Sequence, residues 1–189
     1  MRAKVWSVIA VSALTLGVIG CASGSAPDGR HQGNVILSIT DFDGLPIQVS
    51  VNAVANAGFL QIGQLTMANI AADPTGATST LMNVEIERYE VGFTRADQGT
   101  RTPQPTVRGI FGMVAVNGTI QYDDLPIMSA EEFTKPPLSD LLTQNGGEDS
   151  ETGSQAILLN LEMKFYGRTL GGDRVETQAP ARFTVQFVE

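Results

Sequence analysis

The 189-residue sequence contains one cysteine, Cys21, and one histidine, His31. With no second thiol, the chain cannot form an internal disulfide or a multi-thiolate metal site. A single histidine in a polar segment argues against histidine triads, multi-histidine metal sites and histidine acid–base chemistry. No cofactor is therefore expected. The stability of the fold must come from a hydrophobic core, which a chain of this length can supply.

The N-terminus lacks an apolar run long enough to span a membrane. Its uncharged stretch, Val5 to Ile19, is shorter than the ~20 residues that a spanning helix needs. Arg2 and Lys4 precede this stretch, and Gly20-Cys21 follows it, which is the layout of a secretory signal. Residues 1–20 are therefore predicted to be a signal peptide that is removed on export.

The segment Val18-Ile19-Gly20-Cys21 resembles the lipobox of bacterial lipoproteins. That resemblance implies cleavage before Cys21 and attachment of a lipid to its thiol. Two or three acyl chains would anchor the protein stably, because each buried methylene contributes about 0.8 kcal/mol. Ala22 and Ser23 follow the cysteine, and the absence of an adjacent aspartate resembles the pattern of Gram-negative lipoproteins that reach the outer membrane. The predicted location is the cell envelope, with the outer membrane favoured over the inner one.

Residues 21–33 are predicted to be the lipidated cysteine and a flexible tether. The tether is rich in Gly, Ser and Ala, and its twelve residues after Cys21 have a root-mean-square reach of about 19 Å. Without residues 1–20 the net charge is (12 − 2) − 20 = −10. Such an acidic protein repels nucleic acid, so a nucleic-acid partner is not expected.

Residues 34–189 are predicted to form a single β-rich domain. Apolar and polar residues alternate in many short segments with glycine-rich turns, which favours an all-β, antiparallel two-sheet sandwich of seven or eight strands. The alternation is clearest from Ile157 to Phe165, and it also indicates strands around Val35–Ile39 and Ile47–Val51. The segment 62–70 fits either a strand or a short helix.

Three local signals refine this prediction. The alternation shifts by one residue near Glu87-Arg88, which predicts a β-bulge. Asn117-Gly118 lies between two strand-like segments and predicts a hairpin turn. Residues 129–144 break the β pattern: Ser129 and Ser139 are candidate caps of one or two short helical turns, and Pro136-Pro137 prevents one continuous helix.

The C-terminal segments Phe165–Arg168, Gly171–Val175 and Phe183–Phe187 resemble the closing hairpin of uncharacterised bacterial lipoproteins with immunoglobulin-like domains. The resemblance covers about the last thirty residues. The sequence lacks the cysteine pair and core tryptophan of antibody domains, so the resemblance to immunoglobulin-like domains implies only a general two-sheet sandwich, and it brings no activity with it.

Acidic loops are the candidate metal sites. Hard cations such as Ca²⁺ prefer clustered oxygen ligands, so the candidate calcium ligands are Asp41, Asp43, Glu148, Asp149 and Glu151. None of these loops completes a twelve-residue calcium loop, and the alternative interpretation is a solvated turn. Another open question is whether Arg88, Arg95, Arg101 and Arg108 form a partner-facing basic strip or are scattered over exposed positions.

The function predicted from these features is that of a non-enzymatic interaction or assembly module, held at the membrane by its lipid and contacting an envelope protein. The alternative is a lipoprotein that binds calcium or an extracellular polymer. A hydrolase that uses only carboxylates is a third possibility, but no motif favours it.

Overall fold

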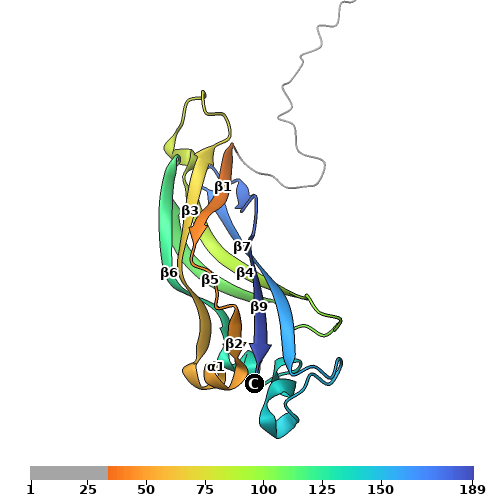
Figure 1. Ribbon diagram of the computed structural model, residues 1–189. Coiled ribbons are helices and arrows are strands. Elements are labelled where there is room, and N and C mark those ends of the chain that lie inside the picture. Colours follow the sequence, from red (N-terminus) through yellow and green to blue (C-terminus); the bar gives the residue numbers. More distant parts are fainter. Residues whose placement is uncertain (1–33) are drawn as a thin grey trace, which may run out of the picture.

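The computed structural model describes residues 34–189 as a β-domain of two facing sheets (Figure 1). The nine strands are β1 (Val35–Phe42), β2 (Gln48–Ser50), β3 (Phe59–Ala71), β4 (Val84–Arg95), β5 (Thr106–Val114), β6 (Gly118–Ser129), β7 (Ala156–Thr169), β8 (Arg174–Glu176) and β9 (Ala181–Val188). The helical elements are short: α1 (Val51–Ala57), α2 (Ala130–Phe133) and the 3-10 turns η1 (Thr80–Met82), η2 (Leu138–Leu141) and η3 (Thr143–Asn145). The predicted all-β fold is confirmed.

The smaller sheet has the strand order β1-β3-β6, and the larger one has the order β2-β9-β7-β4-β5, with β8 paired to one end of β7. Neighbouring strands are antiparallel except β2 and β9, which run parallel. The helices α1 and α2 lie together at the end of the molecule where the chain terminates, and the β3–β4 loop lies at the other end (Figure 1).

The core lies between the two sheets, and β7 shows why it forms there. Its odd-numbered side chains from Ile157 to Phe165 are buried, and its even-numbered side chains face outward. This is the two-residue period of a strand with one buried face. Tyr89 of β4 and Tyr122 of β6 pack against Phe165, with ring centroids 5.5 and 6.1 Å away, and so join the two sheets.

The predicted bulge at Glu87-Arg88 is confirmed. Glu87 is an extra residue in β4 between the pairs that Ile86 and Arg88 make with β7. Over the same stretch β5 places two residues opposite Glu87. Between the same two flanking pairs, β7 has no extra residue, β4 has one and β5 has two. This stepwise lengthening bends and twists the sheet here.

The predicted hairpin at Asn117-Gly118 was wrong, although a turn is present. Asn117 has a positive φ of 59°, but β5 pairs with β4 and β6 pairs with β3 in the other sheet. The cause is a contact with β3: the Asn117 N–H donates to the Asn69 carbonyl at 2.7 Å, and the Ala71 N–H donates to Asn117 Oδ1 at 3.1 Å. This contact directs the chain into the smaller sheet.

The strand predicted over Ile47–Val51 is reduced to β2, because Val51 begins α1. The Ser50 hydroxyl accepts a hydrogen bond from the Ala53 N–H at 3.2 Å and caps the helix. The helix ends at Gly58, whose φ of 100° suits glycine.

The segment 62–70 is entirely strand, as part of β3. Residues 129–144 were predicted to hold one or two short helical turns, and α2, η2 and η3 lie over 130–145; η1 was not predicted. Ser129 precedes α2 without a side-chain capping bond, and Ser139 lies inside η2 rather than at its start.

Candidate functional site

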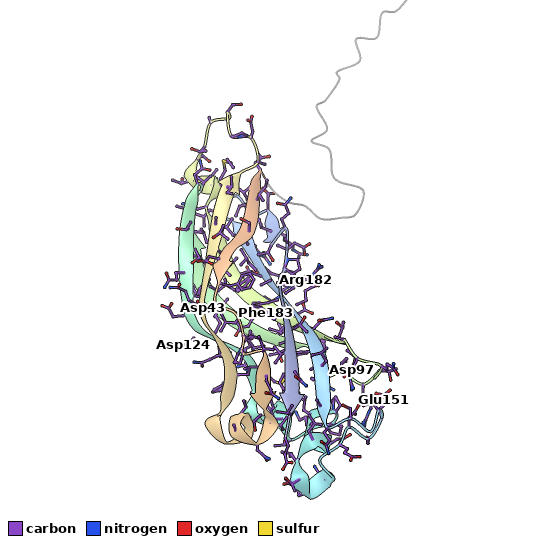
Figure 2. All side chains as sticks on the ribbon, viewed as in Figure 1. Asp43, Asp97, Asp124, Glu151, Arg182 and Phe183 are labelled. Carbon is purple, nitrogen blue, oxygen red and sulfur yellow. The ribbon has the colours of Figure 1, made fainter. Side chains whose placement is uncertain are left out.

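A groove lies on the solvent-facing side of the larger sheet, across β9, β7 and β4. It has a volume of about 640 Å³. We call it the sheet groove; its outward-facing side chains come from Glu90, Thr94, Asn160, Glu162, Lys164, Tyr166, Arg182 and Thr184. Figure 2 shows Arg182 on β9 beside Phe183, whose side chain is buried in the core.

The strand register arranges these side chains in rows across the sheet. In one row, Thr184 lies opposite Asn160, and its hydroxyl donates to Asn160 Oδ1 at 2.8 Å. In the next row, Arg182 lies opposite Glu162, with its Nε 3.2 Å from Glu162 Oε2. Lys164 also reaches Glu162, with 2.9 Å between Nζ and Oε1. The groove therefore presents paired donors and acceptors in fixed positions.

Gly92 forms a gap in the middle of this surface. Gly92 is on β4, opposite Glu162 of β7, and any other residue at this position would add a side chain to the surface. A Cβ at this position would meet only the Glu162 carbonyl oxygen, at 3.9 Å, so the space above Gly92 is open. A glycine inside a strand often marks a close approach of a ligand or another backbone.

Tyr166 closes one end of the groove. Its hydroxyl donates to Glu90 Oε2 at 3.3 Å, and the Arg88 guanidinium lies 4.6 Å from the centre of its ring. Burial, with the nearby Glu90 carboxylate, raises the pKa of Tyr166 above its ordinary value. The phenol therefore stays protonated at neutral pH and acts as a donor.

The charges of Glu162 and Lys164 are also held in their neutral-pH states. The hydrogen bond from Lys164 lowers the pKa of Glu162, and Arg182 adds to this effect. The same hydrogen bond raises the pKa of Lys164. With fixed charges, hydroxyls and an amide, the groove is suited to bind a polar ligand through hydrogen bonds.

A second polar group lies where the end of β4 and η2 meet the loops 96–105 and 146–155. We call it the arginine cluster; it consists of Arg95, Asp97, Arg101, Asp140, Asp149 and Glu151. Arg95 Nη2 lies 2.8 Å from Asp149 Oδ2, and Arg95 Nε lies 2.6 Å from Asp97 Oδ1. Arg101 Nη2 lies 2.8 Å from Asp140 Oδ2. The cluster ties the two loops together, and Figure 2 shows Asp97 and Glu151 close to each other there.

Arg95 and Asp149 are almost completely shielded from solvent, with side chains 3% and 0% exposed. Burial alone would raise the pKa of Asp149, but hydrogen bonds from Arg95 and Thr152 outweigh it and lower the pKa to about 2. Asp149 is therefore an ion-paired carboxylate that serves the fold.

The structure brings together only part of the predicted calcium ligand set. Asp149 and Glu151 lie in one loop, but Glu151 accepts hydrogen bonds from the N–H groups of Thr100 and Arg101, at 2.8 and 3.0 Å. Glu148 is exposed on the same loop. Among residues 34–189, no group of three or more acidic, cysteine or histidine side chains is arranged to hold a metal ion.

The other two predicted ligands, Asp41 and Asp43, are exposed at the end of β1 and just after it. Figure 2 shows Asp43 well separated from Glu151. Calcium binding at either loop stays a prediction, and at Asp149 the ion would have to displace Arg95.

Cys21 and His31 lie outside the described residues. Within residues 34–189, no helix is both long and apolar enough to cross a membrane. The four arginines considered as a basic strip have different surroundings: Arg95 and Arg101 belong to the arginine cluster, whereas Arg88 covers Tyr166 and Arg108 lies 5.7 Å from the Phe59 ring centre.

Sequence reasoning missed the groove, and it singled out Arg95, Arg101, Asp149 and Glu151 without predicting that they contact one another. The groove depends on which residues of β4, β7 and β9 lie side by side, and no local motif encodes that register. The buried partner of Arg95 is 54 positions away. An isolated glycine in the alternating segment 84–95 was the one available signal for the groove. No family model, curated protein or solved structure matches the chain.

Proposed function

We propose that this protein is a lipid-anchored envelope protein that acts as a non-enzymatic binding module, and that the sheet groove binds a polar segment of an envelope protein partner. The observation that carries the proposal is the groove itself. Its paired donors and acceptors surround an open space at Gly92, and the strand register fixes them in place.

The charges favour a protein segment as the ligand. Glu90 and Glu162 balance Lys164 and Arg182, so the groove carries no net charge and can pair with both signs along one peptide. The lipobox-like segment ending at Cys21 supports placement at the envelope, where such a partner is within reach of the predicted tether.

A second candidate is a hydroxyl-rich envelope polymer. One end of the groove carries neutral hydrogen-bonding groups, namely Thr94, Asn160 and Thr184, and such groups suit sugar hydroxyls. The loss of Trp6 with the signal peptide leaves this ligand without an indole to stack on, so the protein partner is preferred.

The test is in-cell photo-crosslinking from position 184 in the full-length protein, followed by detergent extraction and mass spectrometry. We expect a reproducible, near-stoichiometric adduct with an envelope protein. The variant Gly92→Gln fills the groove without a backbone clash and should abolish the adduct. Gly44→Gln is the matched control, because a Cβ at Gly44 meets nothing within 4 Å and lies outside the groove.

Three outcomes are distinguishable. Loss of the adduct in Gly92→Gln alone supports the groove as the binding site. An unchanged adduct in Gly92→Gln contradicts it. Co-sedimentation with isolated envelope polysaccharide that Gly92→Gln abolishes, in the absence of any protein adduct, replaces the protein partner with the polymer.

A further inference from the structure

The strand β5 forms one edge of the larger sheet and presents an apolar row to solvent. Val107, Phe111 and Met113 are 58%, 71% and 48% exposed, and Gly109 is exposed between them. The outward row of β4 next to it contains Glu85 and Glu90. Polar side chains thus cover the neighbouring strand, while apolar ones lie on the edge strand itself.

An exposed apolar row is unusual on a strand at the edge of a sheet. Unpaired N–H and C=O groups on an edge strand can bind another strand, so natural edges are usually short, covered or charged. The other three edges follow this rule. β2 has three residues, and β1 is covered where the Gln178 N–H donates to the Leu37 carbonyl at 2.9 Å. β6 carries an outward polar row with Thr119, Gln121 and Asp123.

Among the described strands, β5 is the long edge whose outward row is apolar; its protection is limited to the bulge opposite Glu87 and to the inward-facing Arg108. Its nine residues include a single charged side chain, Arg108, which does not lie in the outward row. Inward and outward positions alternate without interruption from Arg108 to Val114, so the outward row is continuous.

The pattern of β5 is complementary to itself. In an antiparallel pair of two β5 strands centred on Ile110, Phe111 lies opposite Gly109 of the second copy, and Val107 lies opposite Met113 of the second copy. A large aromatic side chain then covers a glycine, which is a favourable cross-strand combination. Arg108 lies opposite Gly112, so the register brings no like charges together.

We propose that β5 is a self-association site, at which two copies of this chain join their larger sheets through antiparallel β5 strands related by a two-fold axis at Ile110. The pairing satisfies edge backbone groups through main-chain hydrogen bonds, and it covers the apolar row on both copies. The contact adjoins the sheet groove, since Val107 lies opposite Glu90, but β5 contributes none of the outward side chains that define that groove.

The first test is the mass of the full-length protein in density-matched detergent micelles, measured by sedimentation equilibrium. We expect two chains per particle at micromolar concentration. Phe111→Lys places a charge in the apolar row and should raise the dissociation constant by at least about tenfold, because aromatic anchors dominate such contacts. Ile47→Lys is the matched control: Ile47 is 83% exposed and precedes β2, at the opposite edge of the sheet.

The second test checks the register. The double variant Gly109→Cys/Phe111→Cys should form an intermolecular disulfide dimer in membranes under mild oxidation. Thr119→Cys/Gln121→Cys on β6 is the matched control and should not. Both variants retain Cys21, so any contribution from that residue is the same in each.

Single chains in the wild-type particles, or dimers that persist unchanged in Phe111→Lys, would overturn the proposal. Equally, a dimer that crosslinks through β6 instead of β5 would overturn the register. A different protein bound in equal amount and lost in Phe111→Lys would show that β5 binds a foreign strand rather than a second copy. Gly92→Gln should leave the dimer intact, which separates this result from the fate of the groove.

Discussion

Arg95 and Asp149 form an ion pair of 2.8 Å in which both side chains are shielded from water, although 54 positions separate them in the chain. Arg95 ends β4, and Asp149 lies in the loop before β7. The pair therefore joins the end of β4 to the loop that leads into β7, its neighbour in the larger sheet.

We expect Asp149→Asn to lower the free energy of unfolding by about 1–3 kcal/mol, because it removes one of the two carboxylates that pair with the buried Arg95 charge, while Asp97 stays at 2.6 Å. Chemical denaturation of the full chain, followed by circular dichroism, measures the change. Glu148→Gln is the control, since Glu148 is exposed on the same loop and should change stability by less than about 0.5 kcal/mol. Equal effects of the two substitutions would show that the ion pair contributes little.

The same carboxylate predicts how stability responds to acid. Its pKa is about 2 in the folded protein, against an ordinary value of 3.8. The unfolded chain therefore takes up this proton at a higher pH than the folded one, and the free energy of unfolding falls as the pH drops from about 5 towards 2. The stabilisation is fully present above this range. We expect a shallower fall in Asp149→Asn, measured by denaturation at a series of pH values; parallel curves would contradict it.

Gly167 should not tolerate even an alanine. A Cβ on Gly167 would lie 2.3 Å from the carbonyl oxygen of Glu85, a backbone atom beside the bulge that cannot move aside freely. Overpacking of this kind costs about 1–3 kcal/mol. Gly167→Ala should therefore lower the thermal unfolding midpoint by several degrees. Gly44→Ala, where the added methyl meets nothing within 4 Å, should not.

The lipid anchor has its own test. Cys21→Ser should release the protein from membranes, because the predicted acyl chains have no other point of attachment, while the β-domain stays folded. Fractionation of cells into membrane and soluble material, with circular dichroism of the purified variant, measures both effects. Retention of Cys21→Ser in the membrane fraction would remove the anchor from the proposed function.

The parts of the fold that follow from short-range pattern were predictable. The alternation of Ile157 to Phe165 predicted β7 because burial on one face leaves a two-residue period in any sequence. The one-residue shift in the alternation at Glu87-Arg88 predicted the bulge for the same reason. The same face of the strand stays buried on both sides of the shift, so one residue must remain unpaired with the neighbouring strand.

Pairing between distant segments was not predictable in the same way. Asn117-Gly118 indicates a turn, but the partner of each flanking strand depends on Asn69, which lies far earlier in the chain. The groove and the ion pair of Asp149 depend on the same kind of long-range register. The sequence of the acidic loop was compatible with calcium binding, and only the fold shows that Arg95 already pairs with the Asp149 carboxylate.

The extra residues that β4 and β5 carry at the bulge, relative to β7, bear on how the lengths of related proteins would differ. In most β-proteins, homologues gain and lose residues in loops, where the backbone has room to adapt. Here a relative with a straighter sheet would lack single residues opposite Glu87, within the strands themselves. A difference in length inside β4 or β5 would therefore record a change in sheet curvature rather than a change at the surface.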